Sequence, residues 1–474
     1  MALTGAPAIP MPGARDAARP RPETPERAYW AVLADGAATR AMEVLAGGAV
    51  LTALAVALGA DGTLLGLLLV ALPALAQAAQ VAGVHWIRRS GRVKPLCLGL
   101  VLPARLLLLA AAAVPYVLTG SVAALALVPL VLVSGLFANA SGVAWGVWMN
   151  ELLPRERLGR FYALRLGIMT LSGLVALAAS AWWLGDRQGD AHALALVFAV
   201  GALAGLVGAV FISRIPARVH VPAPGSTGNI VSAFRSAHAY RRALPGFIAL
   251  TTGLHLFVPF GVAMLLIGGG YPESTTLLLV AWSQVVALVA FPVLGWLSDR
   301  ARSAAATGVA VRVAGRRFAL GPRLVDPLGL VRTLSGHGAV AAVGAGTLAA
   351  AAVLWMVASN AGYPILLVLA IYTLNGLGTA AVDLAIGNLQ MWLAPRGHAP
   401  ALFAGTALIR AVAAAGAGLF AGAMLSRTAA GDPLVWAAGG AFLAAAAVLL
   451  ARAGREAPPV ETQPAREASP TIAR

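Results

Sequence analysis

Long apolar segments separated by short polar turns run through most of this chain. The pattern is clearest around residues 121–149, which contain no ionisable side chain, and after Arg165, where none follows until Asp186. The charges between these two segments are concentrated in one short turn. Helices that are apolar on every face belong inside a lipid bilayer, where backbone groups must be satisfied within the helix itself. The pattern therefore predicts membrane-spanning helices joined by turns at the membrane surface.

The whole chain repeats this arrangement, and each apolar segment is long enough for a hydrocarbon core of ~30 Å, which needs ~20 residues. The predicted fold class is an all-α polytopic membrane protein with twelve transmembrane helices in two six-helix halves. The predicted spans are residues 30–59, 63–86, 96–118, 121–149, 161–184, 191–213, 245–268, 274–297, 336–358, 362–393, 401–425 and 433–451.

Polar segments divide the chain into larger units. In the linker, Ile230, Phe234, Ala237 and Leu244 recur at helical spacing, which predicts a short helix on the membrane surface. The sequence Leu-Leu-Leu-Val-Ala at 67–71 recurs at 277–281, which supports two related halves. The predicted units are a disordered cytoplasmic tail (1–28), an N-terminal bundle (29–213), a cytoplasmic linker (214–244), a C-terminal bundle (245–452) with a long basic loop (298–334), and a second disordered cytoplasmic tail (453–474).

Composition excludes several classes of protein. Apolar residues make up 59% of the chain and charged residues 11%, against roughly 25% charged residues in a soluble domain. The formal charge of +16 is spread over short turns between apolar segments, so it does not indicate a nucleic-acid partner. A single cysteine, Cys97, excludes a disulfide framework and a cysteine-based zinc site. The only lysine, Lys94, follows no phosphate-binding glycine motif, so we expect neither metal nor cofactor.

The basic residues also predict the orientation in the membrane. If the N-terminus is cytoplasmic, 28 of the 34 Lys and Arg residues fall on the cytoplasmic face, and only Arg187 and Arg427 fall on the opposite face. The positive-inside rule then places both termini in the cytoplasm. We therefore expect a multi-pass protein of a bacterial inner membrane. Its expected partners are the lipid bilayer, a small-molecule substrate and a coupling proton, with the protein itself monomeric.

Three turns carry a resemblance to a known family. The turns after the second and eighth predicted spans share glycine and charged residues, and the turn between the fourth and fifth spans contains Gly-Arg-Phe. These turns resemble the gating loops of the major facilitator superfamily of secondary transporters, and a bacterial branch of it in particular. Arg88 stands where the family has an acid. The gating-loop residues implied by the resemblance are Arg89, Gly91, Arg92, Arg155, Arg160, Gly295, Asp299 and Arg300.

Ionisable and amide side chains inside the predicted spans are the candidates for substrate binding and coupling, because a charged residue inside a membrane costs ~2.5–3.5 kcal/mol on insertion scales. In the resembled fold, the first, fourth, seventh and tenth spans line a central cavity. The resemblance thus implies cavity positions for Asp35, Arg40, Glu43, Asn139, His255, Asn375 and Asp383. Arg105 and Arg410 lie in other spans and complete the candidate set.

Each candidate also has a structural interpretation. Arg40 and Glu43 are three residues apart and can pair on one helix face, and Arg105 can pair with an acid of the first span. His255 is equally compatible with packing. For Asp383 we favour a cavity role, either as a proton carrier or as a ligand for a cationic group, over an ion pair with Arg410.

The predicted function is secondary active transport of a small organic solute by alternating access, coupled to protons, and we favour export over uptake. One alternative is a protein of the transporter fold that assembles with or senses a partner, which the altered first turn and the long basic loop would suit. A polytopic membrane enzyme would need a cluster of acids or histidines at one membrane face. The sequence shows no such cluster, so we expect no enzyme activity.

Overall fold

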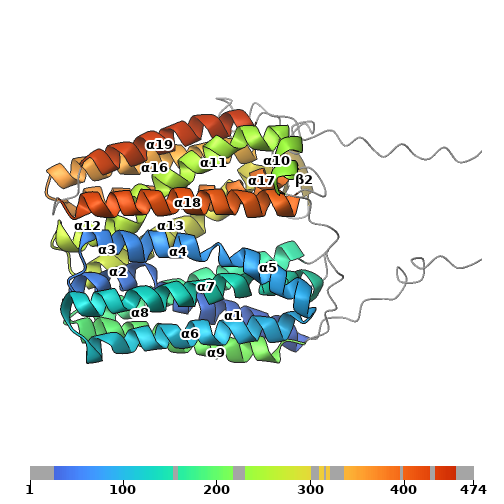
Figure 1. Ribbon diagram of the computed structural model, residues 1–474. Helices are drawn as coiled ribbons and strands as arrows, with labels where there is room; N and C mark the ends of the chain where they lie inside the picture. The colour runs from blue at the N-terminus through green and yellow to red at the C-terminus, as the bar shows by residue number, and fades with distance from the viewer. Residues whose placement is uncertain are drawn as a thin grey trace, which may run out of the picture.

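The computed structural model describes residues 26–152, 158–216, 230–299, 309–313, 316–320, 336–394, 399–427 and 433–454. Within these residues, 12 helical segments are long and apolar enough to cross a membrane. They lie roughly parallel in one elongated bundle (Figure 1). The predicted all-α polytopic fold with twelve spans is therefore confirmed.

The first six spans are made of nine α-helices and one π-helical turn. The first span is α1 (Glu26–Leu45) followed by α2 (Gly48–Ala57), and the second is divided into α3, a π-helical turn η1, α4 and α5. The bounds of the remaining segments are α3 Gly62–Gly66, η1 Leu67–Ala71, α4 Leu72–Ala76, α5 Ala79–Ser90, α6 Val93–Val117, α7 Gly120–Leu152, α8 Leu158–Trp183 and α9 Ala191–Arg214.

The last six spans follow the short helix α10 (Ile230–Ser236). The structure divides the predicted surface helix of the linker, because residues 238–244 already belong to the seventh span. The bounds are α11 His238–Phe257, the 3-10 turn η3 Val258–Phe260, α12 Gly261–Ile267, α13 Glu273–Asp299, α16 His337–Asn360, α17 Ile365–Leu393, α18 Ala399–Leu425 and α19 Pro433–Ala453.

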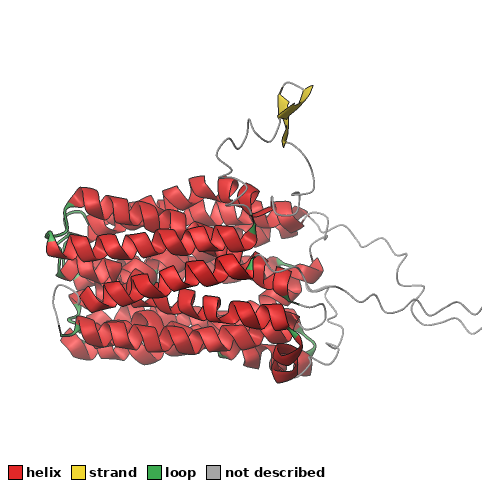
Figure 2. Ribbon diagram, turned by 90° about the horizontal axis from the view of Figure 1, so that it is seen from above, coloured by secondary structure: helices red, strands yellow, loops and turns green. Residues whose placement is uncertain are grey.

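A small β-hairpin lies in the long basic loop, where the sequence predicted no regular structure. Strand β1 (Val309–Val313) pairs antiparallel with β2 (Arg316–Leu320), and Val309 lies opposite Leu320. β-branched and aromatic residues in these segments favour extended backbone. The hairpin stands outside the helical bundle (Figure 2).

Packing groups the spans into two sets. In the first set α1 packs against α8 and α9, and α6 packs against α7 and α9. In the second set α16 packs against α17 and α19, and α11 packs against α18 and α19. Glycine and alanine allow this close approach, since membrane helices associate through small residues. At Gly338, for example, a Cβ atom would lie 2.7 Å from the carbonyl oxygen of Leu450.

The two sets meet where α8 packs against α13, and several further contacts between them lie at one end of the bundle. We call this end the distal end, and the opposite end, where α1 begins and α19 ends, the terminal end (Figure 1). At the distal end α18 packs along α3 and η1, and α12 packs against α2. Toward the terminal end, α5 packs against α6 and α7 of its own set.

The first and seventh spans are interrupted at corresponding points in their second halves. The first span breaks at residues 46–47, where Gly48 takes a positive φ of +44° that favours glycine. The seventh span passes through the 3-10 turn that contains Pro259, whose ring disfavours a regular helix. The number of residues between the two breaks is about the same as the number between the two Leu-Leu-Leu-Val-Ala segments, 67–71 and 277–281. They occupy corresponding places in the two halves.

Candidate functional site

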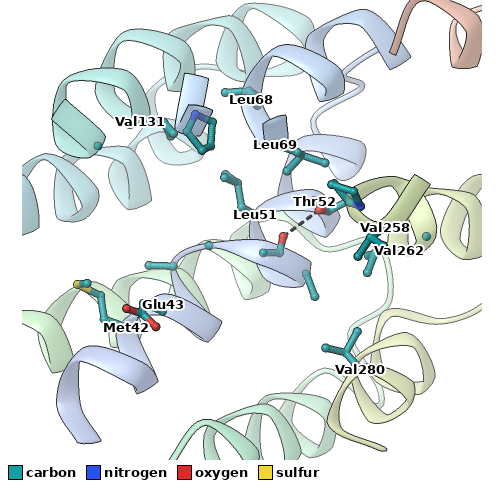
Figure 3. Close-up of a pocket in the computed structure, with 18 of the residues that line it drawn as sticks. Met42, Glu43, Leu51, Thr52, Leu68, Leu69, Val131, Val258, Val262 and Val280 are labelled. Atoms are coloured by element: carbon teal, nitrogen blue, oxygen red, sulfur yellow. Dashed lines mark hydrogen bonds between the residues drawn. The ribbon is translucent and has the colours of Figure 1, made fainter. Parts of the chain in front are cut away.

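A cavity of about 650 Å³ lies between the two halves. Both interrupted spans contribute to its wall, together with segments of η1, α4, α6, α7, α13 and α17. Much of this wall is aliphatic, as the close-up in Figure 3 shows. The aliphatic lining side chains are Leu51, Leu68, Leu69, Leu108, Val131, Val258, Val262 and Val280.

Glu43 is the only charged side chain that lines this cavity within the described part of the chain. Its Oε2 atom accepts a hydrogen bond of 3.1 Å from Nη1 of Arg40, which is three residues earlier on α1. Nη2 of Arg40 donates to Oε1 of Gln284 on α13, also at 3.1 Å. Arg40 therefore connects the cavity carboxylate of the first half to a lining amide of the second half.

Asp35 and Arg105 lie away from the cavity, inside the first half. Asp35 is 2% exposed and Arg105 is 5% exposed. Oδ1 of Asp35 lies 3.5 Å from Nη2 of Arg105, and Oδ2 lies 3.8 Å from Nη2 of Arg165. Thr39 donates to Asp35 at 3.1 Å and accepts from Arg105 at 3.0 Å. One buried carboxylate thus has two guanidinium partners.

The two candidate asparagines do line the cavity, from opposite halves. Asn139 is held by its neighbours: its Nδ2 donates to the carbonyl oxygen of Gly135 at 2.9 Å, and its Oδ1 accepts from Gln80 at 3.3 Å. Asn375 differs, because its Oδ1 is buried and has no hydrogen-bond partner. An unsatisfied buried acceptor costs about 1–3 kcal/mol. Among the described residues, Asn375 is therefore the lining amide whose oxygen has no partner, although that atom is covered by its neighbours.

Asp383 lies one helical turn beyond Thr379, on the same face of α17. Thr379 lines the cavity, and the exposed residues Asp383, Gly387 and Met391 continue this stripe toward the terminal end. Among the described residues Asp383 makes no direct ion pair, and Arg40 and Arg410 are the basic groups that act on it electrostatically. The ion pair with Arg410, the structural alternative for Asp383, is not formed in this structure.

His255 and Arg410 meet at Thr251, inside the second half. Nε of Arg410 donates to Oγ1 of Thr251 at 2.7 Å, and Nδ1 of His255 lies 2.7 Å from the Thr251 carbonyl oxygen. Neither side chain lines the cavity itself. The structure therefore places both side chains in the packing of the second half rather than in the cavity wall.

The distal end of the cavity is closed by contacts between the halves. Oγ1 of Thr63 lies 3.0 Å from Oγ of Ser426, and Glu273 accepts from the backbone N–H of Gly189 at 2.9 Å. A Cβ atom at Gly62 would lie 2.6 Å from the Gly422 carbonyl oxygen, so α3 and α18 touch through their backbones. The exposed stripe on α17 leads the other way. In the described residues, the contacts that close the cavity lie at the distal end.

The gating-loop candidates lie at the terminal end. Gly91 ends α5 with a left-handed φ of +61°, and Arg89 and Arg92 beside it are exposed. Arg155 and Arg300 fall outside the described residues. Gly295 and Asp299 belong to the last turns of α13, and Arg160 belongs to the first turn of α8.

Sequence reasoning did not select three residues that the structure connects to these groups. Gln284 is the one amide side chain in α13, and this residue could have been selected from the sequence. Arg165 sits at a span end, and its guanidinium carbon lies 4.4 Å from the centre of the Trp145 ring. Tyr372 is 5% exposed, lines the cavity and packs against Trp355. Among the described residues, no group of three His, Cys, Asp or Glu side chains could hold a metal ion.

Solved structures of transporters share this fold. The chain is similar to the xylose transporter XylE from E. coli in a partially occluded inward open conformation, with a TM-score of 0.61 and 12% identity over 90% of this chain and 97% of that one. It is also similar to the nucleoside transporter NupG (TM-score 0.54, 13% identity, 92% and 100% covered). A bacterial homolog of the human lysosomal transporter Spinster, inward-facing and unoccupied, gives a TM-score of 0.58 at 13% identity, with 91% and 96% covered.

At these identities the structural similarities establish the fold alone. A comparison with curated protein sequences finds no match. The family profile of the Major Facilitator Superfamily matches residues 36–320, which is more than half of the chain. Together with the fold, this match identifies a membrane transporter and not an enzyme. The chain belongs to the Major Facilitator Superfamily.

Proposed function

We propose that this protein is a proton-coupled secondary transporter that exports a small organic solute from the bacterial cytoplasm. Its cavity would open alternately to the two sides as the halves rock about it. The concentration of Lys and Arg in the turns supports a cytoplasmic terminal end and an inner-membrane location. In that orientation the structure corresponds to the state that takes up solute from the cytoplasm.

The observation that carries the coupling proposal is the position of Asp383. Its carboxylate is exposed on the stripe that leads out of the cavity, and it makes no direct ion pair among the described residues. Arg40 of the first half and Arg410 of the second half both act on it. A carboxyl group with these neighbours can bind and release a proton without breaking an existing ion pair, and its charge is felt by both halves.

A screen for the solute comes first. Purified protein would be mixed with metabolites and drugs across a range of pH, and its thermal unfolding would be followed. A ligand that binds only the folded state at ~100 Kd stabilises it by about 2.7 kcal/mol. A saturable stabiliser then becomes the substrate for flux measurements in proteoliposomes.

Substitution of Asp383 by Asn should separate coupling from transport. We expect Asp383→Asn to lose accumulation driven by a pH gradient while it retains exchange of labelled for unlabelled solute, because exchange needs no proton transfer. Asp186→Asn, at an exposed distal turn, is the matched control. Full gradient-driven transport by Asp383→Asn would remove this residue as the proton carrier.

A disulfide across the distal contact should stop the transport cycle. Thr63→Cys with Ser426→Cys would place two sulfur atoms where the hydroxyl oxygens now lie 3.0 Å apart. The single native cysteine, Cys97, is buried and should not interfere. Oxidation should abolish solute exchange and reduction should restore it, whereas either single cysteine should be insensitive. Unchanged exchange after complete cross-linking would show that the distal contact does not open during transport.

A further inference from the structure

The hydrogen-bonding capacity of the cavity wall is mostly used within the protein. The hydroxyl groups of Thr52, Ser134, Ser283 and Thr379 all donate to backbone carbonyl oxygens, at distances of 2.7 to 2.9 Å. Figure 3 shows one of these bonds, from Thr52 to Gly48. A polar solute with many hydroxyl groups would find few free donors here and would lose its hydration against aliphatic side chains.

Among the described residues, two lining side chains carry an acceptor oxygen without a hydrogen-bond partner, and only that of Glu43 belongs to an exposed side chain. One carboxylate oxygen of Glu43 accepts a hydrogen bond from Arg40, and the other has no hydrogen-bond partner among the described residues. The Glu43 side chain is 45% exposed. Asn375 contributes the unsatisfied Oδ1 described above. The wall therefore combines one accessible carboxylate with a large aliphatic surface. That combination matches a solute with a positive charge and an apolar body, since a cation in a low-dielectric site needs a counter-charge.

Arg40 interacts with both Glu43 and Asp383. It is bonded to Glu43, it acts electrostatically on Asp383, and its second nitrogen holds Gln284. A cation that pairs with Glu43 competes with Arg40 for this carboxylate. A displaced guanidinium keeps its bond to Gln284 and has Asp383 as the remaining acid in its surroundings.

Building on the proposed function, we propose that the cavity binds an organic cation with an apolar body through Glu43, and that the displaced Arg40 pairs with Asp383, which releases its proton. The charges balance. Before binding, Glu43 is paired with Arg40 and Asp383 carries a proton. Afterwards, Glu43 is paired with the cation, Arg40 is paired with ionised Asp383, and one proton has left to the solvent. One cation is thus exchanged for one proton, as antiport requires.

The other groups around Asp383 do not supply this switch. Arg410 of α18 is held by Thr251, and His255 of α11 lies against the same threonine. On α13, the side chain bound to Arg40 is the uncharged Gln284. On α16, His337 packs on Trp392, which lies nine residues beyond Asp383 on α17. Of the groups that act on Asp383, Arg40 is the one bound to a cavity-lining carboxylate.

The test uses binding by the purified full-length protein, without any gradient. The probes are three apolar cations, namely tetraphenylphosphonium, 4-phenylbutylammonium and benzalkonium, together with the anions tetraphenylborate and 4-phenylbutyrate. We expect saturable binding of at least one cation and of neither anion. Saturable binding of the anions alone, or of none of the five probes, would overturn the proposal.

Three substitutions test the individual steps. Glu43→Gln should weaken cation binding about tenfold to a hundredfold, the range for losing a hydrogen bond to a charged group. Arg40→Gln should instead strengthen cation binding, because the competitor for Glu43 is gone, and should abolish proton release. Asp383→Asn should keep cation binding and also abolish proton release. Asp186→Asn is again the control and should behave as the wild type.

Proton release is measured with a pH indicator in weak buffer when the cation is added. One proton per bound cation is expected for the wild type. Binding without proton release, or weaker binding in Arg40→Gln, would refute the exchange of ion pairs. If no probe binds but a solute from the thermal screen is accumulated by a pH gradient, the cation assignment fails while proton-coupled transport stands.

Discussion

Replacing Asp35 by Asn should be the most destabilising single substitution among the ionisable residues of the spans. Within the described ranges, Asp35 is the acid that pairs with two guanidinium groups, those of the buried Arg105 and of Arg165, whose side chain is 14% exposed. Removing one partner of a buried ion pair costs about 3–5 kcal/mol, because the remaining charge is left uncompensated. We expect Asp35→Asn to lower the melting temperature strongly in detergent, or to prevent recovery of folded protein.

Two comparisons keep this prediction specific. Asp190→Asn removes a charge whose side chain is 47% exposed and whose ion-pair partner in the described part of the chain is His192, and an Asn can still cap α9, so it should cost at most about 1 kcal/mol. Arg165→Gln leaves the closer pair of Asp35 and Arg105 intact and should be milder than Asp35→Asn. If Asp35→Asn unfolds at the same temperature as Asp190→Asn, the ion pairs of Asp35 with Arg105 and Arg165 do not stabilise the folded protein as their geometry indicates.

Adding one methyl group at Gly422 should displace the conformational equilibrium toward the distal-open state. A Cβ atom there would overlap the backbone of Gly62 and Gly66, which has no side-chain atom that could move aside. Overpacking of this kind costs about 1–3 kcal/mol, and each 1.4 kcal/mol is about a tenfold change in population. Because the contact exists only when the distal end is closed, Gly422→Ala penalises that state alone.

The measurement is the distance between spin labels on Thr119→Cys and Asn360→Cys, which are exposed positions next to distal turns of the two halves. The distance distribution should move to longer values in Gly422→Ala, and solute exchange should fall. Gly416→Ala is the matched control, since a Cβ atom on that residue of the same helix meets nothing within 4 Å. An unchanged distribution in Gly422→Ala would mean that α3 and α18 do not set the distal closure.

Local interactions explain what could be predicted about the site. Arg40 and Glu43 are three residues apart on one helix, so their pairing follows from helical geometry alone, and the structure shows it. Asn375, Thr379 and Asp383 follow at intervals of four on α17, so their common face was equally predictable. Pairing of Arg105 with an acid of the first span was one of the alternatives, and the structure forms that pair with Asp35. The sequence did not indicate the second partner, Arg165 on α8, or that these contacts hold Asp35 away from the cavity.

The sequence by itself determined that this chain crosses a membrane twelve times and predicted which face holds its basic turns. Insertion depends on the hydropathy of contiguous segments and on flanking charges, and both can be read along the chain. The tertiary structure decided where the first and seventh spans break, which polar groups are free in the cavity, and which end is closed. Those features depend on contacts such as Arg40 with Gln284 and Thr63 with Ser426, whose partners lie hundreds of residues apart. No local pattern encodes such contacts, because they form only when the two halves pack together.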